Sequence, residues 1–436
     1  MKKAKYPKPS RYHNIREMIE STVKEKGRAP AFYQKLNGKY QAFSYSRLKN
    51  NIKALGVSLM RRGLGGKKFI LIEESSYPFS LAYITALCGL GTVIPVSKNI
   101  SDAELASIAK ITSAAAIIYP KSLENKTASV PKKLQKIDFD EILLLCDMGL
   151  SFSDRELGEF DKISIDIDAT AIISFARAKD GSKRGIMLSQ RNICSALEGL
   201  SLALPYPKNT STLAILPPHS VFETVTGILY PLSQGCTVCF CDDTKQILPT
   251  AKDLNPSSIV CSAGFIEKLY SKIQYNIRKR EINKKVSDLI KVTDAIKIPS
   301  LRIKAKRKVF ADIHKAFGEN MTDLTVGGIS ADSEAVTGLR ALGFNVTCVY
   351  GITECASVIA LTDSKGDLRV IPSGEIKITA KDKNGAGKLC YRGDNVMIGY
   401  YKEENLNRSI KINGWIDTED IGRIDDDGVL DVLKKQ

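Results

Sequence analysis

The chain lacks three features that would assign it directly to a class of protein. No apolar stretch follows Met1-Lys2-Lys3, so the sequence shows no secretory signal peptide. The longest uncharged run, residues 75–96, contains two prolines, two glycines and several hydroxyl side chains. Because a membrane-spanning helix needs roughly 20 mostly apolar residues, this run is better interpreted as buried strands, loop and helix. No G-x-x-x-x-G-K-[ST] phosphate loop is present either, which argues against a P-loop nucleoside triphosphatase.

Cysteine is present, but its placement argues against disulfides and metal binding. Most of the ten cysteines lie inside apolar runs, where a thiol behaves as a small hydrophobic group. Without a signal peptide, this pattern predicts a reducing, cytoplasmic compartment. Cys236, Cys239 and Cys241 form a C-x-x-C-x-C cluster, but strand alternation places only two of them on one face. Since no second pair of ligands follows, we do not expect a metal site there.

Positive charge is in excess and is concentrated in one segment. The chain has 64 basic and 48 acidic side chains, a net charge of +16. Residues 278–308 contain twelve Lys or Arg against Glu281, Asp288 and Asp294, a local net charge of +9. Nucleic acid is not expected, because the segment has no interleaved aromatic residues and no recognisable reader motif. The alternatives are a solvated helical face, peripheral contact with an anionic membrane, or contact with a phosphorylated ligand.

Apolar periodicity predicts an α/β protein. Apolar residues at helical spacing mark helices near residues 14–26 and 46–62. From Lys68 onward, short apolar strands alternate with amphipathic helices, a pattern typical of βαβ units in parallel sheets. Beyond Gly351 the pattern changes to short strands separated by Gly, Asn and Asp turns.

We therefore predict two doubly wound βα subdomains followed by a small β-barrel-like subdomain. The expected boundaries are residues 1–165, 166–350 and 351–430, with residues 431–436 as a hinge. Ligands of doubly wound sheets bind where the carboxyl ends of the strands face a crevice. The oligomeric state cannot be predicted from the sequence.

A basic, glycine-containing loop lies near the start of the second predicted subdomain. An apolar run at residues 171–175 enters this loop, and a helix is expected to begin near Ser189. Backbone N–H groups and a helix dipole at such a junction favour a bound anion. By itself the pattern is equally typical of an ordinary strand–helix connection. The predicted phosphate-binding residues are Gly181, Ser182, Lys183, Arg184 and Gly185.

Three further stretches give the loop a specific meaning. They read VYGITEC at residues 349–355, following Gly327-Gly328, then YRGDNVMIGYY at 391–401 and NGWIDTEDIG at 413–422. In this order and at these distances they resemble the acyl-adenylate-forming (AMP-binding) superfamily, which includes acyl-CoA synthetases, firefly luciferase and peptide-synthetase adenylation domains. The resemblance extends from about Asn14 to Leu433. It is most similar to bacterial long-chain fatty acyl-CoA synthetases, and implies the fold of their large N-terminal domain.

The resemblance implies that the first of these stretches contacts a nucleotide through Tyr350, Gly351, Thr353 and Glu354. Tyr350 would offer a flat face to adenine and Thr353 a hydroxyl to the α-phosphate. Glu354 would supply a hard oxygen ligand, suited to Mg²⁺. A plainer role for Glu354 is that of a carboxylate at a helix start.

The resemblance also implies roles for two glycines and one aspartate. Gly327 and Gly328 would let the backbone approach adenine closely. Asp420 would accept hydrogen bonds from both ribose hydroxyls; its plainer alternative is an ordinary turn residue.

The implied reaction is attack of a fatty acid carboxylate on the α-phosphate of Mg²⁺·ATP, which gives acyl-AMP and pyrophosphate. A thiol, usually that of coenzyme A, then displaces AMP. Positioning and charge neutralisation dominate such steps. The apolar character of residues 221–232 favours an apolar acyl pocket. The alternative is a pseudoenzyme that keeps the scaffold, binds nucleotide or an acyl ligand, and has lost efficient adenylation.

The phosphate loop departs from the family pattern T-S-G-T-T-G-x-P-K-G. Only its two later glycines are kept, Arg184 replaces lysine, and the early hydroxyls are lost. Asp180 stands where a threonine would face the β- and γ-phosphates, and a carboxylate there repels polyphosphate unless it is neutralised. The cations expected to offset it are Arg177, Lys179, Lys183 and Arg184.

Three more departures follow. Many relatives carry two histidines where this chain has His219 and Ser220, so His219 is the histidine predicted to act in the reaction, with helix capping or packing as its alternative. Glu419 replaces the family glycine before Asp420. Family members continue past a hinge into a mobile lid domain that carries a lysine for the reacting groups. We expect this lid to be absent after residue 436 and the chain itself to be slow or inactive.

Overall fold

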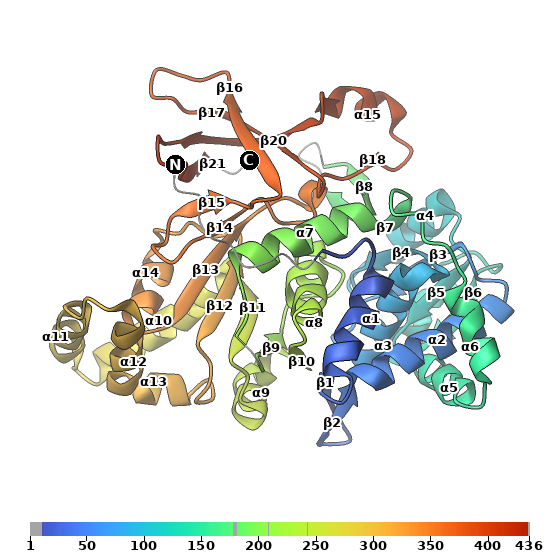
Figure 1. Ribbon diagram of the computed structural model, residues 1–436, viewed down its shortest axis with the longest axis horizontal. Coiled ribbons are helices and arrows are strands. Elements are labelled where there is room, and N and C mark those ends of the chain that lie inside the picture. Colours follow the sequence, from blue (N-terminus) through green and yellow to red (C-terminus); the bar gives the residue numbers. More distant parts are fainter. Residues whose placement is uncertain (1–10, 178–180, 208, 242, 435–436) are drawn as a thin grey trace.

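Three β-sheets organise the chain in the computed structural model, which describes residues 11–177, 181–207, 209–241 and 243–434. Figure 1 shows two large sheets side by side, with helices between and around them and a smaller antiparallel sheet above. The predicted α/β class, with two parallel sheets and a small antiparallel subdomain, is confirmed.

The largest sheet has nine strands, and its six central strands from β13 to β1 run parallel. Residues on both of its faces are buried, which explains the continuous apolar runs of its strands. In spatial order the strands are β15 (Leu368–Val370), β14 (Ala360–Thr362), β13 (Asn345–Tyr350), β12 (Asp323–Gly327), β11 (Ser258–Ser262), β9 (Ser211–Ala214), β10 (Thr237–Phe240), β1 (Pro30–Leu36) and β2 (Lys39–Ser44).

The second sheet has seven strands, five of them parallel. Its edge is formed by the β7–β8 hairpin and by β18, which pairs with β8 from more than 200 residues further along the chain. In spatial order the strands are β18 (Gly399–Tyr400), β8 (Lys183–Ser189), β7 (Thr170–Arg177), β4 (Gly91–Val96), β3 (Lys67–Ile72), β5 (Ala116–Tyr119) and β6 (Gln135–Asp138).

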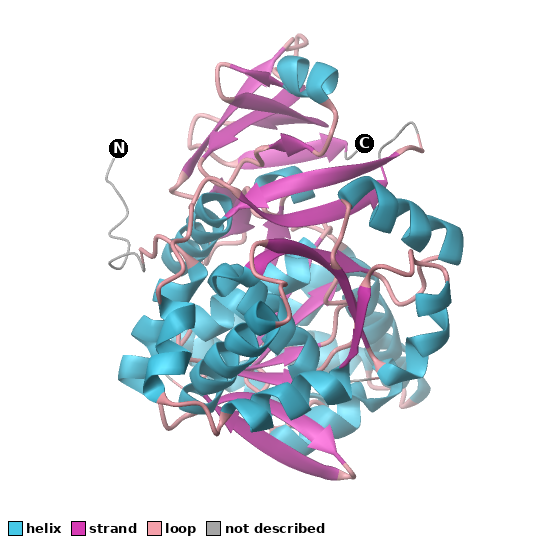
Figure 2. Ribbon diagram, turned by 90° about the vertical axis from the view of Figure 1, so that its right-hand side faces the viewer, coloured by secondary structure: helices cyan, strands magenta, loops and turns pink. Residues whose placement is uncertain are grey.

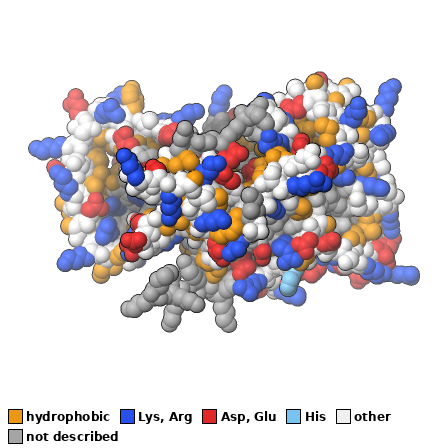
Figure 3. Space-filling model, turned by 90° about the horizontal axis from the view of Figure 1, so that it is seen from above, with side chains coloured by type: hydrophobic (Ala, Val, Ile, Leu, Met, Phe, Trp, Pro, Cys, Tyr) orange, Lys and Arg blue, Asp and Glu red, His pale blue; other side chains and the backbone are white. Residues whose placement is uncertain are grey.

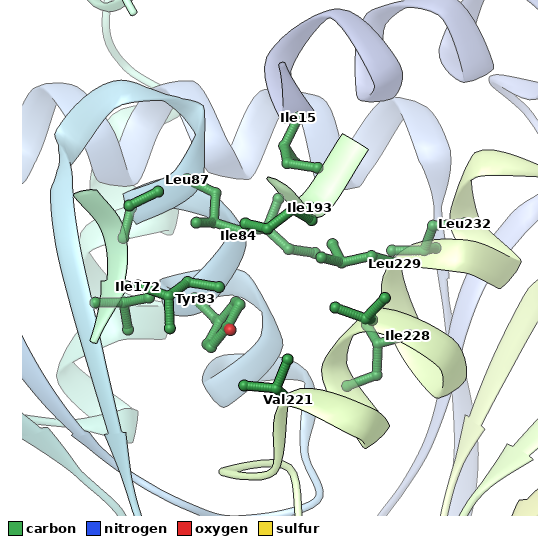
Figure 4. Packing of buried hydrophobic residues seen from close by; sticks show 14 of the residues in the cluster. Ile15, Tyr83, Ile84, Leu87, Ile172, Ile193, Val221, Ile228, Leu229 and Leu232 are labelled. Atoms are coloured by element: carbon green, nitrogen blue, oxygen red, sulfur yellow. The ribbon is translucent and has the colours of Figure 1, made fainter. Parts of the chain in front are cut away.

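One hydrophobic core joins the two large sheets. It contains residues from the facing sides of both sheets and from the helices between them, and Figure 4 shows how Tyr83, Val221 and Ile228 approach one another within it. The helical segments that contribute to it are α1 (Ile15–Lys26), α2 (Tyr45–Arg61), α3 (Tyr77–Thr85), η1 (Ala86–Leu90), α5 (Phe139–Gly149), α6 (Asp154–Asp161), α7 (Gln190–Ala203), η3 (Glu223–Leu229) and α8 (Tyr230–Ser233).

The opposite faces of the two sheets have their own, smaller cores. Helix α4 (Asp102–Thr112) covers the seven-stranded sheet, and α9 (Ile247–Leu254), α10 (Ala263–Lys279) and α14 (Glu334–Ala341) cover the nine-stranded sheet. Among the described residues, no helix has both the length and the apolar character of a membrane span. The other helical segments are η2 (Lys121–Ala128), η4 (Thr244–Gln246), α11 (Asn283–Asp294), α12 (Pro299–Val309), α13 (Ala311–Lys315), η5 (Thr353–Cys355) and α15 (Glu404–Ile410).

The third sheet is antiparallel and forms one end of the molecule, as Figure 2 shows. Its β19–β20 turn contains Asn413 and Gly414 at φ values of +53° and +80°, the left-handed conformation that an Asn-Gly hairpin turn requires. Its strands are β16 (Gly374–Thr379), β17 (Gly387–Gly393), β19 (Lys411–Ile412), β20 (Trp415–Ile424) and β21 (Leu430–Lys434).

Strand pairing crosses the predicted boundary between residues 165 and 166. Strands β1 and β2, which the sequence reading missed, join the nine-stranded sheet through Phe32 and Tyr33, opposite Val238 and Cys239 of β10. Strands β7 and β8, placed in the second subdomain, join β4 in the seven-stranded sheet. Each sheet is therefore assembled from both sides of that boundary.

Candidate nucleotide site

The predicted site residues gather at the carboxyl ends of parallel strands. Gly327 ends β12 and Tyr350 ends β13, while His219 follows β9 in the same sheet. Glu73 follows β3 of the second sheet and lies against His219. Ligands of doubly wound folds bind at such strand ends, so the topology brings together residues that are more than 270 positions apart.

A cavity of about 880 Å³ opens beside these strand ends, between the nine-stranded and antiparallel sheets. Its lining includes Gly328 and Tyr350 together with residues of β20 and β21. Gly328 has a φ of +81°, and a Cβ added there would meet no described atom within 4 Å. The glycine is needed for the backbone conformation, and a side chain would project into open space. This supports a close ligand approach at Gly328.

Other predicted glycines are explained by packing. A Cβ at Gly327 would lie 2.8 Å from the Phe222 ring, and one at Gly351 would lie 2.2 Å from the Ser357 carbonyl oxygen. At Gly185 it would lie 3.0 Å from the side chain of Ile173. In these positions glycine allows protein elements to pack closely.

Asp420 lies behind the tyrosine of the cavity. The Tyr350 hydroxyl donates to its carboxylate at 2.8 Å and contacts the Thr418 hydroxyl at 3.3 Å. Asp420 is 5% exposed, and burial raises the pKa of Tyr350 well above its ordinary range. The two predicted nucleotide residues are thus directly coupled, and the Tyr350 ring is fixed at the wall of the cavity.

Glu354 connects the nucleotide loop with the second sheet. Its carboxylate accepts a hydrogen bond from the Tyr400 hydroxyl at 2.9 Å, and the Arg184 guanidinium lies over the Tyr400 ring at 5.5 Å. Thr353 and Glu354 are half-buried at the start of η5. The half-buried Glu354 carboxylate suits a Mg²⁺ ligand that shares its site with phosphate. No cluster of three or more His, Cys, Asp or Glu able to hold a metal occurs among the described residues.

The 391–401 stretch acts as a structural clamp around this loop, a role that the sequence did not indicate. The fully buried Asn395 donates to the carbonyls of Cys355 and Val358 at 3.0 and 2.6 Å. Asn192 of α7 donates to the carbonyls of Asp394 and Val396 at 2.7 and 2.8 Å. These amides fix the Thr353–Glu354 loop relative to the helix that follows β8.

The predicted phosphate loop differs from the expected strand–loop–helix layout. Lys183, Arg184 and Gly185 belong to strand β8, which pairs antiparallel with β7. Helix α7 begins only after β8, where the Ser189 hydroxyl accepts from the Asn192 N–H. The helix N-terminus and the loop therefore lie at opposite ends of β8, so the expectation that the helix dipole faces the loop is wrong. Ala178, Lys179 and Asp180 lie outside the described residues.

The described cations of the loop have protein partners. Lys183 forms an ion pair with Glu104 in the first turn of α4. Arg177 donates to the Gly181 carbonyl at 3.3 Å, and Arg184 contacts Tyr400 as described above. Gly181 has a φ of +80°, and it and Ser182 are exposed. Both are accessible at the tip of the hairpin.

His219 has a partner that the sequence reading missed. Its Nδ1 lies against the carboxylate of Glu73, which is 4% exposed. Burial alone would raise the pKa of Glu73, but hydrogen bonds and the charge of His219, with the Lys98 N–H and the Ser97 hydroxyl, lower it overall. The carboxylate–imidazole pair lies one residue beyond the end of β3.

Glu223 is a buried carboxyl group four residues after His219. It lies at the start of the π-helix η3, is 1% exposed, and neither carboxylate oxygen has a hydrogen-bond partner among the described residues. Burial raises its pKa well above the ordinary range. π-Helical turns are frequent at functional sites. Burial thus favours the neutral form of this carboxyl group.

The cysteine cluster is apolar packing. Cys236 and Cys239 are buried, and burial raises the pKa of each thiol to about 12. Cys239 and Cys241 pack in the core of the outer face of the nine-stranded sheet.

Solved structures with the same architecture define the fold. The N-terminal domain of FACL13 from Mycobacterium tuberculosis superposes with a TM-score of 0.77 at 16% identity, over 97% of this chain and 100% of that one. The MenE o-succinylbenzoate–CoA synthetase of Bacillus subtilis, in complex with AMP, gives a TM-score of 0.72 at 17% identity, over 96% and 98% of the two chains.

The family model for AMP-binding enzymes matches residues 19–401, and the chain belongs to this family. Long-chain-fatty-acid–CoA ligase FadD15 of Mycobacterium bovis is 22% identical over 93% of this chain and 71% of its own length. Long-chain-fatty-acid–CoA ligase 5 of Rattus norvegicus is 24% identical over 93% of this chain. The chain spans 65% of the length of that rat relative.

Proposed function

We propose that the protein is an AMP-forming ligase that activates a fatty acid with ATP and passes the acyl group to a thiol, coenzyme A. The observation that carries this proposal is the convergence of Gly328, the Tyr350–Asp420 pair and Glu354 at the carboxyl ends of β12 and β13. The named ligases among its relatives support the fatty acid as substrate.

In this proposal each described residue binds or orients a group. A carboxylate oxygen of the fatty acid attacks the α-phosphorus of ATP, and the bond to pyrophosphate breaks. Gly328 and the fixed Tyr350 ring hold adenine, and Asp420 accepts from the ribose hydroxyls. Thr353 contacts the α-phosphate, and Glu354 would hold Mg²⁺, which offsets the phosphate charge when bound. The thiol sulfur then attacks the acyl carbon, and AMP leaves.

Fatty-acid-dependent exchange of pyrophosphate into ATP tests this function in the full natural chain. We expect exchange with at least one acid in a panel of chain lengths, and loss of AMP binding in Asp420→Ala. If the wild-type protein showed no pyrophosphate exchange with any acid of the panel, the proposed ligase function would be contradicted.

A second candidate is a pseudoenzyme that binds nucleotide without adenylating efficiently. The observation that favours it is the phosphate hairpin, where Lys183 is paired with Glu104 and Arg184 with Tyr400. AMP binding together with absent pyrophosphate exchange would support this candidate and exclude the first.

We also propose that the protein works in the cytoplasm, at the surface of an anionic membrane. All ten cysteines are free, in keeping with a reducing compartment. Helices α11 and α12 lie at one end of the molecule in Figure 1, and at that end Figure 3 shows Lys and Arg side chains projecting outward among hydrophobic ones. Val292, Ile298 and Leu301 are 69%, 55% and 51% exposed there. Exposed apolar groups beside cations are typical of interfacial binding.

Co-sedimentation with vesicles tests the membrane contact. Leu301, Lys304 and Lys308 lie on one face of α12, because they are three and four positions apart. We expect binding to vesicles that contain phosphatidylserine and loss of that binding in Lys304→Glu/Lys308→Glu. The matched control is Lys132→Glu/Lys133→Glu, which removes two exposed lysines outside this segment. Equal loss in both variants, or no binding by the wild type, would contradict the contact.

A further inference from the structure

We propose that Glu73 is a positioning residue for His219: it holds the imidazole in the Nδ1–H tautomer, so that Nε2 accepts a hydrogen bond from a donor group of the substrate. The inference rests on the proposed ligase function and adds a residue to its site. Glu73 lies 146 positions before His219, and no motif in the sequence marks it.

The carboxylate of Glu73 is immobilised from several directions. One oxygen accepts from the Ser97 hydroxyl at 3.0 Å and from the Lys98 N–H at 3.1 Å, both just beyond the end of β4. The other oxygen faces the Nδ1 atom and the backbone N–H of His219, the latter at 3.4 Å. Both oxygens are thus committed to donors from two other segments, and the side chain cannot rotate away without losing several hydrogen bonds.

The protonation of the pair follows from these donors. Burial opposes ionisation of Glu73, but the hydrogen bonds and His219 lower its pKa overall, so the group is a carboxylate at neutral pH. A carboxylate only accepts, so the ring nitrogen against it must carry a proton. When the ring is neutral, Nε2 is then the acceptor, and the partner that fixes the other nitrogen sets this tautomer.

His219 is the accessible member of the pair. Its side chain is 34% exposed, whereas that of Glu73 is 5% exposed. Three residues further on, Phe222 packs against Gly327, next to the glycine that lines the nucleotide cavity. The pair therefore joins the carboxyl ends of strands from both large sheets. The donor that such a ligase presents is the S–H of the thiol, because the acid reacts as its carboxylate, which only accepts hydrogen bonds.

Nitrogen NMR of the histidine rings tests the tautomer directly. The chain has three histidines, His13, His219 and His314, so His219→Gln assigns the resonances of the ring. We expect the Nδ1–H tautomer in the wild type. In Glu73→Gln the amide oxygen still accepts from Ser97 and Lys98 while its NH₂ faces Nδ1, so the ring should change to the Nε2–H tautomer. An Nε2–H tautomer in the wild type would overturn the inference.

Kinetics separate a positioning role from a purely structural one. In Glu73→Gln we expect kcat to fall at least tenfold at a temperature where the variant is folded, with a lower melting temperature because the His219 N–H loses its acceptor. Loss of the transfer from acyl-AMP to thiol, with pyrophosphate exchange retained, identifies the S–H as the donor, and loss of exchange as well would overturn that assignment. Glu74→Gln removes the same charge one residue along and should change neither tautomer nor rate. Unchanged kinetics in Glu73→Gln would overturn the inference. If the wild-type protein showed no pyrophosphate exchange, the proposed ligase function would be contradicted. The NMR result alone would then show whether Glu73 sets the tautomer of His219.

Discussion

The candidate site has a nucleoside side and a phosphate side, and the two differ in how many of the expected ligand-binding groups are available. On the nucleoside side, Gly328 opens into a cavity of about 880 Å³ and Tyr350 is held by Asp420. On the phosphate side, the hairpin lacks the early hydroxyls of the family pattern, and Lys183 and Arg184 contact protein groups. From this difference we propose that recognition of AMP is retained and that contact with the triphosphate is weakened.

The largest expected effect is on the nucleoside side. Gly328→Ala places a methyl group in the cavity, so AMP affinity should fall at least tenfold, about 1.4 kcal/mol. The left-handed backbone also costs an L-residue roughly 1–2 kcal/mol. Gly63→Ala is the matched control, since its φ of +73° and open surroundings impose the same backbone cost away from the cavity. Calorimetric titration with AMP, together with urea unfolding, checks both variants. Equal AMP affinity in the two variants would contradict AMP binding in the cavity beside Gly328.

The next effect concerns the stability of the core that contains the buried carboxyl group of Glu223. The pKa of Glu223 is higher in the folded than in the unfolded chain, so unfolding releases a proton and stability falls as pH rises through this interval. Glu223→Gln should therefore stabilise the protein more at pH 8 than at pH 5. The gain in the free energy of unfolding is about 1.4 kcal/mol for each pH unit by which the pH exceeds the pKa of Glu223 in the unfolded chain, up to its pKa in the folded chain. Urea unfolding at both pH values measures it, and an equal effect at both would refute the buried neutral carboxyl.

A smaller effect sharpens the phosphate side. Glu104→Gln releases Lys183 from its ion pair and should raise ATP affinity by up to roughly tenfold, about 1.4 kcal/mol, with AMP affinity unchanged. Asp102→Asn removes a charge from the same helical turn and leaves Lys183 paired, so it should not discriminate between the two nucleotides. A parallel gain for AMP, or none for ATP, would show that the pair does not limit phosphate binding.

The smallest effect is at the family glycine that this chain lacks. Glu419 has a φ of +64°, the region in which glycine is favoured. Glu419→Gly should raise the free energy of unfolding by less than about 1 kcal/mol, because relief of strain is offset by the greater entropy of the unfolded glycine. Denaturant unfolding checks this, and a loss of stability would mean that the Glu419 side chain contributes more than its backbone costs.

Local order was predictable because it depends on neighbouring residues. The two N-terminal helices, confirmed at Ile15–Lys26 and Tyr45–Arg61, begin after Asn14 and Ser44, whose side chains accept from backbone N–H groups of the first turn. Strand β1 and its partner were missed although Asn37-Gly38, with φ values of +50° and +80°, is a strong hairpin signal.

Long-range partners were not predictable in the same way. The Glu73–His219 pair and the Lys183–Glu104 pair join segments that only the sheet topology brings together. The family pattern predicts that Tyr350 and Asp420 serve one nucleotide site, but it gives no indication that their side chains are hydrogen-bonded to each other. The same pattern suggested a helix dipole at the phosphate loop, which the β7–β8 hairpin contradicts.

The most direct test of the central claim is a titration of one preparation with AMP and, separately, with Mg²⁺·ATP. An intact phosphate loop would add several charge-assisted hydrogen bonds of roughly 1.5–3 kcal/mol each, and so a large preference for ATP. We expect the two dissociation constants to lie within about tenfold of one another. ATP binding that is more than about a hundredfold tighter than AMP binding would contradict it.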